Sequence, residues 1–168
     1  MSKGAVALIF ILGLTLTACG SYEGLSSSDL KKEGERMLSN NRYDEAARLF
    51  ADVFRADPTK NENAYKVAEA YYAARNYVKA KEYYQILKDE FVEYPLAGIR
   101  YARCLKQMGY YVDAKEAFTD VALGYKNSDV DFVQKLIEQE VKGCDLAQKL
   151  SSTPDTTTYY LRHLNSLI

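Results

Sequence analysis

The stretch YDEAARLF at residues 43–50 returns in altered form as YVKAKEYY at residues 77–84 and as YVDAKEAF at residues 111–118. The copies are evenly spaced, and each has a tyrosine first, an alanine fourth and an aromatic residue eighth. Further positions keep the same spacing: Gly34, Ala68 and Ala102; Met37, Tyr71 and Leu105; and Val53, Leu87 and Val121. A constant period of about 34 residues, with small residues at fixed places, is typical of stacked helix-turn-helix units, which form binding surfaces.

The period divides residues 28–128 into three units. They run from about residue 27 to 60, from 61 to 94 and from 95 to 128. In each unit we expect a helix, a tight turn and a second helix. Ser28 and Asp29 offer an N-cap at the start of the first unit. Asn41 and Gly109 favour turns between paired helices, and Pro58 ends the second helix of unit one.

The residue types at the repeated positions suit close packing of helices. Small residues let the two helices of a unit approach each other, and the aromatic residue fills the space between successive units. One such unit cannot bury its own apolar face, and about three are needed for a stable array.

This pattern resembles the tetratricopeptide repeat (TPR) family over most of residues 28–128. The family has small residues at two fixed positions, an aromatic residue before each, and a late proline. Pro58 fits the pattern, whereas Val92 and Lys126 stand where later prolines would be. The resemblance implies an all-α fold with three TPR repeats in a short right-handed solenoid. A different helical hairpin repeat of the same period is the alternative.

Beyond the repeats, residues 129–150 predict a capping helix that covers the third unit. Its expected apolar stripe is Phe132, Leu136, Ile137, Val141 and Leu146. Residues 151–168 contain a linker with Pro154 and then an apolar tail that ends in Leu167 and Ile168.

Residues 1–18 have the features of a removable signal peptide. A short positive start is followed by an apolar run at residues 5–16, which is too short to cross a bilayer. The run closes with Leu-Thr-Ala-Cys at residues 16–19, which resembles the bacterial lipobox. That resemblance implies that Cys19 carries a covalent lipid such as palmitate, with residues 19–27 as a tether to the membrane. The alternative is an ordinary signal peptide and an incidental thiol at Cys19.

Gly20 follows the cysteine, and no aspartate stands there. This pattern resembles that of enteric lipoproteins sent to the outer membrane. It implies a lipoprotein anchored on the periplasmic face of the outer membrane.

The charge balance argues against a nucleic-acid-binding protein. The chain has 22 Lys and Arg against 23 Asp and Glu, so it has no excess of positive charge to attract nucleic acid.

The cysteines and the search for catalytic motifs point to neither a metal site nor an enzyme. Cys104 occupies a small-residue position, which predicts a buried free thiol. Two remaining cysteines and the single His163 are too few ligands for zinc. We find no phosphate loop, nucleophile elbow or zinc-protease motif and expect no enzyme and no cofactor beyond the lipid; a catalytic carboxylate pair is the open alternative.

Mapping by the repeat offset places a binding groove on the first helices of units two and three. Its predicted residues are Tyr65, Glu69, Tyr72, Ile99, Arg103 and Lys106. Exposed tyrosines among charges suit the capture of a peptide or helix. The alternative is that these tyrosines are ordinary amphipathic surface. Glu35 and Glu69 stand where chaperone-binding TPR domains need asparagine, which argues against a C-terminal carboxylate ligand.

The end of the sequence resembles a junction between domains in large envelope lipoproteins. The resemblance covers residues 142–147, the Pro/Thr linker and residues 164–166. Those proteins carry TPR repeats first, then a β-propeller, and last an OmpA-like domain. The resemblance implies a scaffold in cell-envelope assembly or secretion machinery with an envelope or outer-membrane protein as partner. The alternatives are a structural subunit or truncated module that docks through its C-terminal tail, and an outer-membrane protein assembly factor. The oligomeric state is left open.

Overall fold

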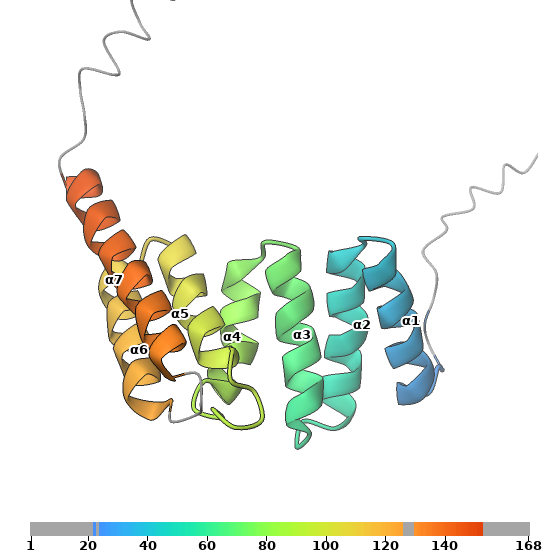
Figure 1. The fold of residues 1–168 in the computed structure, drawn as a ribbon. Coiled ribbons are helices and arrows are strands. Elements are labelled where there is room, and N and C mark those ends of the chain that lie inside the picture. Colours follow the sequence, from blue (N-terminus) through green and yellow to red (C-terminus); the bar gives the residue numbers. More distant parts are fainter. Residues whose placement is uncertain (1–21, 23, 126–129, 153–168) are drawn as a thin grey trace, which may run out of the picture.

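The computed structural model describes residues 22, 24–125 and 130–152, and in this part the chain forms seven α-helices and no strand. The helices are α1 (Ser27–Ser39), α2 (Tyr43–Ala56), α3 (Asn61–Ala73), α4 (Tyr77–Leu87), α5 (Ala97–Gln107), α6 (Tyr111–Gly124) and α7 (Val130–Ser152). Successive helices pack against one another in chain order, so that three hairpins and a final helix form an elongated array (Figure 1). The predicted all-α fold is confirmed.

Each hairpin turns at a residue with left-handed backbone conformation. Asn41, Arg75 and Gly109 have φ angles of 58°, 58° and 86° and stand at equivalent positions of the three units. In the second hairpin, the N–H of Asn76 then donates to the carbonyl oxygen of Tyr71 at 2.9 Å, and equivalent bonds close the other two turns. These bonds satisfy carbonyl groups that the end of a helix leaves free.

The start of α1 differs by two residues from the prediction. Ser26, and not Ser28, is the N-cap, and its Oγ accepts a hydrogen bond from the N–H of Asp29 at 3.2 Å. The helix α2 ends at Ala56, two residues before Pro58, as expected from that proline.

The repeated positions form the core. All fifteen members of the five small, aliphatic and aromatic triplets are buried; they are Gly34, Ala68, Ala102, Met37, Tyr71, Leu105, Ala46, Ala80, Ala114, Phe50, Tyr84, Phe118, Val53, Leu87 and Val121. At Gly34 the two helices of unit one approach so closely that an added Cβ would lie 2.6 Å from the ring of Phe50. Burial of each aromatic side chain stabilises the fold by about 2–3 kcal/mol.

The capping helix is present, but its predicted stripe is partly wrong. Val133, Ile137 and Cys144 are its buried residues, whereas Phe132 and Leu146 are 70% and 58% exposed. With 23 residues, α7 is longer than the helices beside it, and its C-terminal end projects beyond them (Figure 1). It also runs to Ser152, past the predicted end at residue 150.

Candidate functional site

Ion pairs link the first helices of successive units along one side of the array. We call this set the charge ladder; its pairs are Glu35 with Lys66, Glu69 with Arg100, and Arg103 with Glu140. The first pair joins α1 to α3, the second joins α3 to α5, and the third joins α5 to α7. Oε2 of Glu69 lies 2.9 Å from Nη1 of Arg100, and Nε of Arg103 lies 2.7 Å from Oε1 of Glu140.

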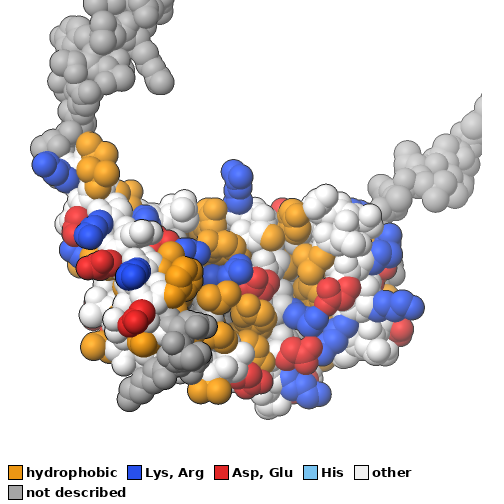
Figure 2. Space-filling view, in the orientation of Figure 1, with side chains coloured by type: hydrophobic (Ala, Val, Ile, Leu, Met, Phe, Trp, Pro, Cys, Tyr) orange, Lys and Arg blue, Asp and Glu red, His pale blue; other side chains and the backbone are white. Residues whose placement is uncertain are grey.

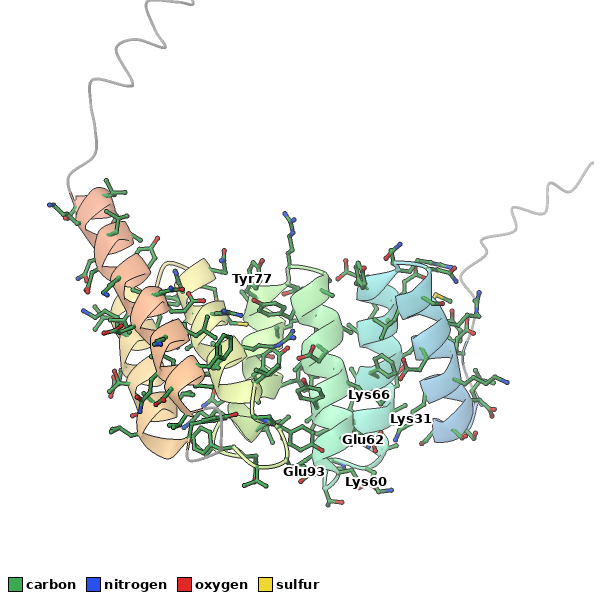
Figure 3. All side chains as sticks on the ribbon, in the orientation of Figure 1. Lys31, Lys60, Glu62, Lys66, Tyr77 and Glu93 are labelled. Carbon is green, nitrogen blue, oxygen red and sulfur yellow. The ribbon has the colours of Figure 1, made fainter. Side chains whose placement is uncertain are left out.

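The charge ladder repeats in sequence as well as in space. Glu35, Glu69 and Arg103 occupy the same position of successive units, and so do Lys66 and Arg100. Partly exposed ion pairs contribute about 0–1 kcal/mol each, so their main effect is to fix how neighbouring units sit. A further pair, Lys31 with Glu62 at 4.0 Å, also joins α1 to α3 (Figure 3).

Glu140 is the most enclosed acid of the charge ladder, with 16% of its side chain exposed. It accepts hydrogen bonds from Nε of Arg103 at 2.7 Å and from Nζ of Lys106 at 2.8 Å. Burial opposes ionisation, but these two cationic donors outweigh it and lower the pKa of Glu140. The two basic residues of α5 that face α7 are therefore both paired with this one acid.

Glu69 also connects the charge ladder to the core. The buried Tyr84 hydroxyl donates a 2.6 Å hydrogen bond to Oε1 of Glu69. On the other side, the guanidinium of Arg100 lies 5.1 Å from the ring centroid of Tyr72, within cation–π range.

Four partly buried tyrosines surround this connection, and we call them the tyrosine face: Tyr65, Tyr72, Tyr77 and Tyr94. Tyr65 and Tyr72 lie two turns apart on α3 with Glu69 between them, so the three share one side of the helix. The ring centroid of Tyr65 lies 5.0 Å from that of Tyr94. Burial raises the pKa of Tyr65 and of Tyr72, so both hydroxyls are neutral near pH 7 and can donate hydrogen bonds.

The other ring contact on this face joins Tyr72 to Tyr77 edge to face, with centroids 5.6 Å apart. Tyr77 stands at the start of α4 (Figure 3). In Figure 2, hydrophobic side chains gather over the middle of the array, and charged side chains flank them. The result is an aromatic surface with polar tips, bordered by paired charges.

The structure brings together five of the six predicted groove residues and corrects the sixth. Tyr65, Glu69 and Tyr72 lie along α3, and Arg103 and Lys106 lie on α5 beside Glu140.

Ile99 is wrong as a groove residue, because its side chain is only 1% exposed. It belongs to a core cluster that also includes Val133 and Ile137 of α7. The repeat offset alone could not reveal that this position is buried, because α7 lies outside the repeats.

Arg100, Tyr94 and Glu140 also belong to this site and were missed. Arg100 was within reach of the sequence, since it stands one period after Lys66 and keeps the same charge. Tyr94 stands at the end of unit two, where the other units have no aromatic residue, and Glu140 lies beyond the repeats, so no sequence signal marks either residue.

The described residues show no arrangement suited to metal chemistry. Among them, no three His, Cys, Asp or Glu side chains could hold a metal ion. Cys104 and Cys144 are buried free thiols, as predicted for Cys104, and burial raises the pKa of Cys104 to about 12. Cys19 and His163 lie outside the described residues.

No helix of the described part is both long enough and apolar enough to cross a membrane. The signal peptide at residues 1–18 and most of the predicted linker and tail lie outside that part.

No model of a known protein family matches the sequence, and neither does any curated protein. Among solved structures, the chain is similar to the crystal structure of the Sgt2 TPR domain from Aspergillus fumigatus. The two share 22% sequence identity with a TM-score of 0.54, over 75% of this chain and 81% of that chain. At this identity the similarity concerns the fold. The described part of the chain therefore has an all-α solenoid fold of three helix-turn-helix repeats and a capping helix, and this fold is similar to that of a TPR domain.

Proposed function

We propose that this chain is a non-enzymatic scaffold that binds a protein partner through the tyrosine face. The tyrosine face is the observation that carries the proposal. Tyrosine offers a large contact area, a polar tip and a small loss of side-chain entropy, and it is enriched at binding hot spots. Tyr65 and Tyr72 are both held by ring contacts, so little further ordering is needed when a partner binds.

The chemistry of this face favours an apolar or aromatic partner segment over a strongly charged one. Glu69 and Arg100 already neutralise each other, and Glu140 pairs with both Arg103 and Lys106. A strongly charged ligand would have to displace these pairs. A helix or peptide with apolar anchors and hydrogen-bonding groups would leave them in place.

We further propose that the scaffold is a lipoprotein anchored through Cys19 on the periplasmic face of the outer membrane. This part of the proposal rests on the Leu-Thr-Ala-Cys motif at residues 16–19 and on Gly20 after it. A partner in cell-envelope assembly or secretion would then meet the repeats within reach of the membrane. More than one acyl chain gives stable anchoring.

The binding proposal is tested by crosslinking in cells. A photoreactive phenylalanine analogue replaces Tyr72 in the full chain, and captured proteins are identified by mass spectrometry. We expect one dominant envelope protein, and we expect Tyr65→Ala to weaken its capture while helix content stays native. Tyr110→Ala is the matched control, because Tyr110 is 52% exposed and lies outside the tyrosine face.

If a folded, membrane-bound protein gives no crosslink at position 72, the tyrosine face is not the docking site. That result would favour docking through residues 156–168, which the same analogue placed at Tyr160 would detect.

Anchoring is tested separately with Cys19→Ser. The variant should lose incorporation of a labelled fatty acid and should leave the membrane fraction. If it stays in the outer-membrane fraction without label, the lipoprotein proposal is wrong.

A further inference from the structure

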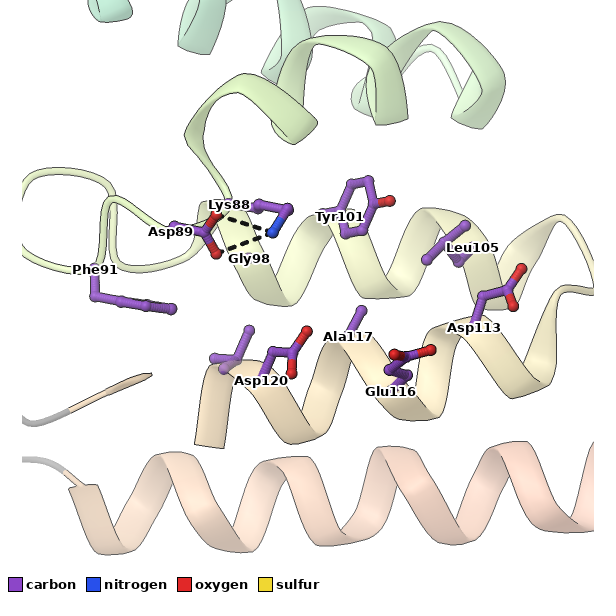
Figure 4. A pocket seen from close by; sticks show the side chains of 11 residues that line it. Lys88, Asp89, Phe91, Gly98, Tyr101, Leu105, Asp113, Glu116, Ala117 and Asp120 are labelled. Carbon is purple, nitrogen blue, oxygen red and sulfur yellow. Dashed lines mark hydrogen bonds and ion pairs between the residues drawn. The ribbon is translucent and has the colours of Figure 1, made fainter. Parts of the chain in front are cut away.

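A separate concave site lies where α5 and α6 meet the end of α4. It is a cleft of about 240 Å³ with apolar surface from Phe91, Tyr101, Leu105 and Val121 (Figure 4). None of the residues that line it belongs to the charge ladder or to the tyrosine face. We call it the acidic cleft, because of the side chains described next.

Three carboxylates follow one another along the α6 side of the cleft. Asp113, Glu116 and Asp120 are spaced three and four residues apart, so they lie on one side of the helix and opposite Tyr101 and Leu105 of α5 (Figure 4). None of the three forms an ion pair within the described part of the chain.

The remaining charges at the cleft lie at one end. Nζ of Lys88 lies 2.9 Å from a carboxylate oxygen of Asp89, so this cation is already paired (Figure 4). Lys88 also attracts Asp120, but the cleft is lined by four acidic residues and this one basic residue, so it keeps a net negative charge.

The spacing of the carboxylates indicates which kind of cation they suit. Asp113 and Asp120 are two helical turns apart, which corresponds to about 10 Å along a helix. No three acidic groups of the described residues converge as a metal ion would require. A negative row beside an apolar wall instead suits the basic side chains of a peptide, whose methylene stems can lie on Tyr101 while their charged ends meet the carboxylates.

We propose that the acidic cleft binds an extended, cationic segment of a protein partner. An extended chain in the polyproline II conformation has three residues per turn and advances about 3.1 Å per residue, so two basic residues three positions apart lie on one side and about 9 Å apart, close to the separation of Asp113 and Asp120 along α6. The apolar wall accommodates the residues between them. This site is independent of the tyrosine face and gives the scaffold a second class of contact.

The test measures peptide binding to the full chain in uncharged detergent. The probe is a fluorescein-labelled hexapeptide that contains Lys-Leu-Ala-Lys, and binding is followed by fluorescence anisotropy. An isomer with two adjacent lysines has the same charge and composition, so it separates spacing from general attraction. We expect the isomer to bind at least threefold more weakly, and this comparison needs no protein variant.

Two matched double variants locate the site. Asp113→Asn with Asp120→Asn removes one charge from the first turn of α6 and one from later in that helix. The control, Asp44→Asn with Glu82→Gln, removes one charge from the first turn of α2 and one from the middle of α4, both away from the cleft. We expect about tenfold weaker binding for the first double variant and less than twofold change for the control.

The proposal is overturned if the wild-type chain does not bind the probe, if both peptides bind equally, or if the two double variants lose equal affinity. Tyr65→Ala serves as a check on independence. It should leave peptide binding unchanged, so a failure at the acidic cleft and a failure at the tyrosine face are distinguishable.

Discussion

The buried hydroxyl of Tyr84 and the carboxylate of Glu69 are joined by a 2.6 Å hydrogen bond between α4 and α3. The second oxygen of the same carboxylate pairs with Arg100 of the next unit. A single acidic side chain thus connects a buried aromatic residue of unit two with the first helix of unit three. Glu69 is therefore a structural residue as well as part of the predicted groove.

Removing either partner of this bond should lower the free energy of unfolding by unequal amounts. We expect a loss of about 1–2 kcal/mol for Tyr84→Phe, because Glu69 keeps its pair with Arg100. Glu69→Ala should cost more, about 2–3 kcal/mol, since the Tyr84 hydroxyl is left buried without an acceptor. Urea denaturation measures both losses, and a double-mutant cycle should show coupling. Two equal, additive losses would contradict the assignment.

Stability should fall at alkaline pH, partly through Tyr84. Burial and the nearby charge of Glu69 raise the pKa of Tyr84 above its ordinary value of about 10. The neutral phenol therefore contributes stability that is fully present below about pH 10 and is lost as the pH rises further. Urea denaturation at intervals from pH 8 to 11 should show a smaller alkaline loss for Tyr84→Phe than for wild type. Parallel curves for the two proteins would sink this account.

Gly34→Ala should destabilise the protein although alanine favours helix. The added Cβ would lie 2.6 Å from the ring of Phe50, which is buried in the core, so the ring or the helices would have to shift. Overpacking costs about 1–3 kcal/mol and the helix-propensity gain offsets about 1 kcal/mol, so we expect a net loss of up to about 2 kcal/mol. Gly143→Ala is the matched control, because its Cβ would meet only the flexible end of Lys106. Thermal unfolding of both variants checks the contrast, and an equal shift in Tm would argue against tight packing at Gly34.

Arg75→Gly should stabilise the protein. Arg75 has a φ of 58° at the turn of the second hairpin, where the equivalent residue of the third hairpin is Gly109. A residue with a Cβ has a steric cost there, and glycine avoids it at some cost in chain entropy. We expect a net gain of about 0.5–1 kcal/mol in the free energy of unfolding. Arg75→Ala keeps the Cβ and should show no gain; a similar gain in both variants would point to the arginine charge instead.

The constant period of the sequence was sufficient to predict the repeats and their core. Buried positions such as Ala80 and Phe118 recur because each unit packs on the next in the same way, so a contact inferred for one unit holds for its neighbours. The unpredicted left-handed turn at Arg75 shows the limit of residue type, since arginine gives no turn signal. The one sign of this turn in the sequence was that Arg75 stands one period after Asn41 and one period before Gly109.

The errors concentrate around α7, where the period breaks. Arg100 of α5 pairs with α3, and Glu140 of α7 pairs with α5 in the corresponding way. However, Glu140 does not stand one period after Arg100 in the sequence. The repeat offset therefore could not place α7 against α5, and Ile99 was assigned to an open surface although it is buried in a core cluster that includes residues of α7. The lipid site at Cys19 is a prediction that lies outside the described residues.

The units cannot be exchanged for one another, because they do not all contribute a side chain of the same charge to the charge ladder. Units one and two present an acid, Glu35 or Glu69, to a base on the first helix of the next unit. Unit three presents Arg103 and requires the acid Glu140 instead. A duplicated copy of unit two could be inserted after itself with its charges matched, whereas a duplicated unit three would set Arg103 against a second Arg100. The charges thus fix the order of the units. Lengthening of the array by tandem duplication is compatible with the ion pairs at unit two and is opposed by charge repulsion at unit three.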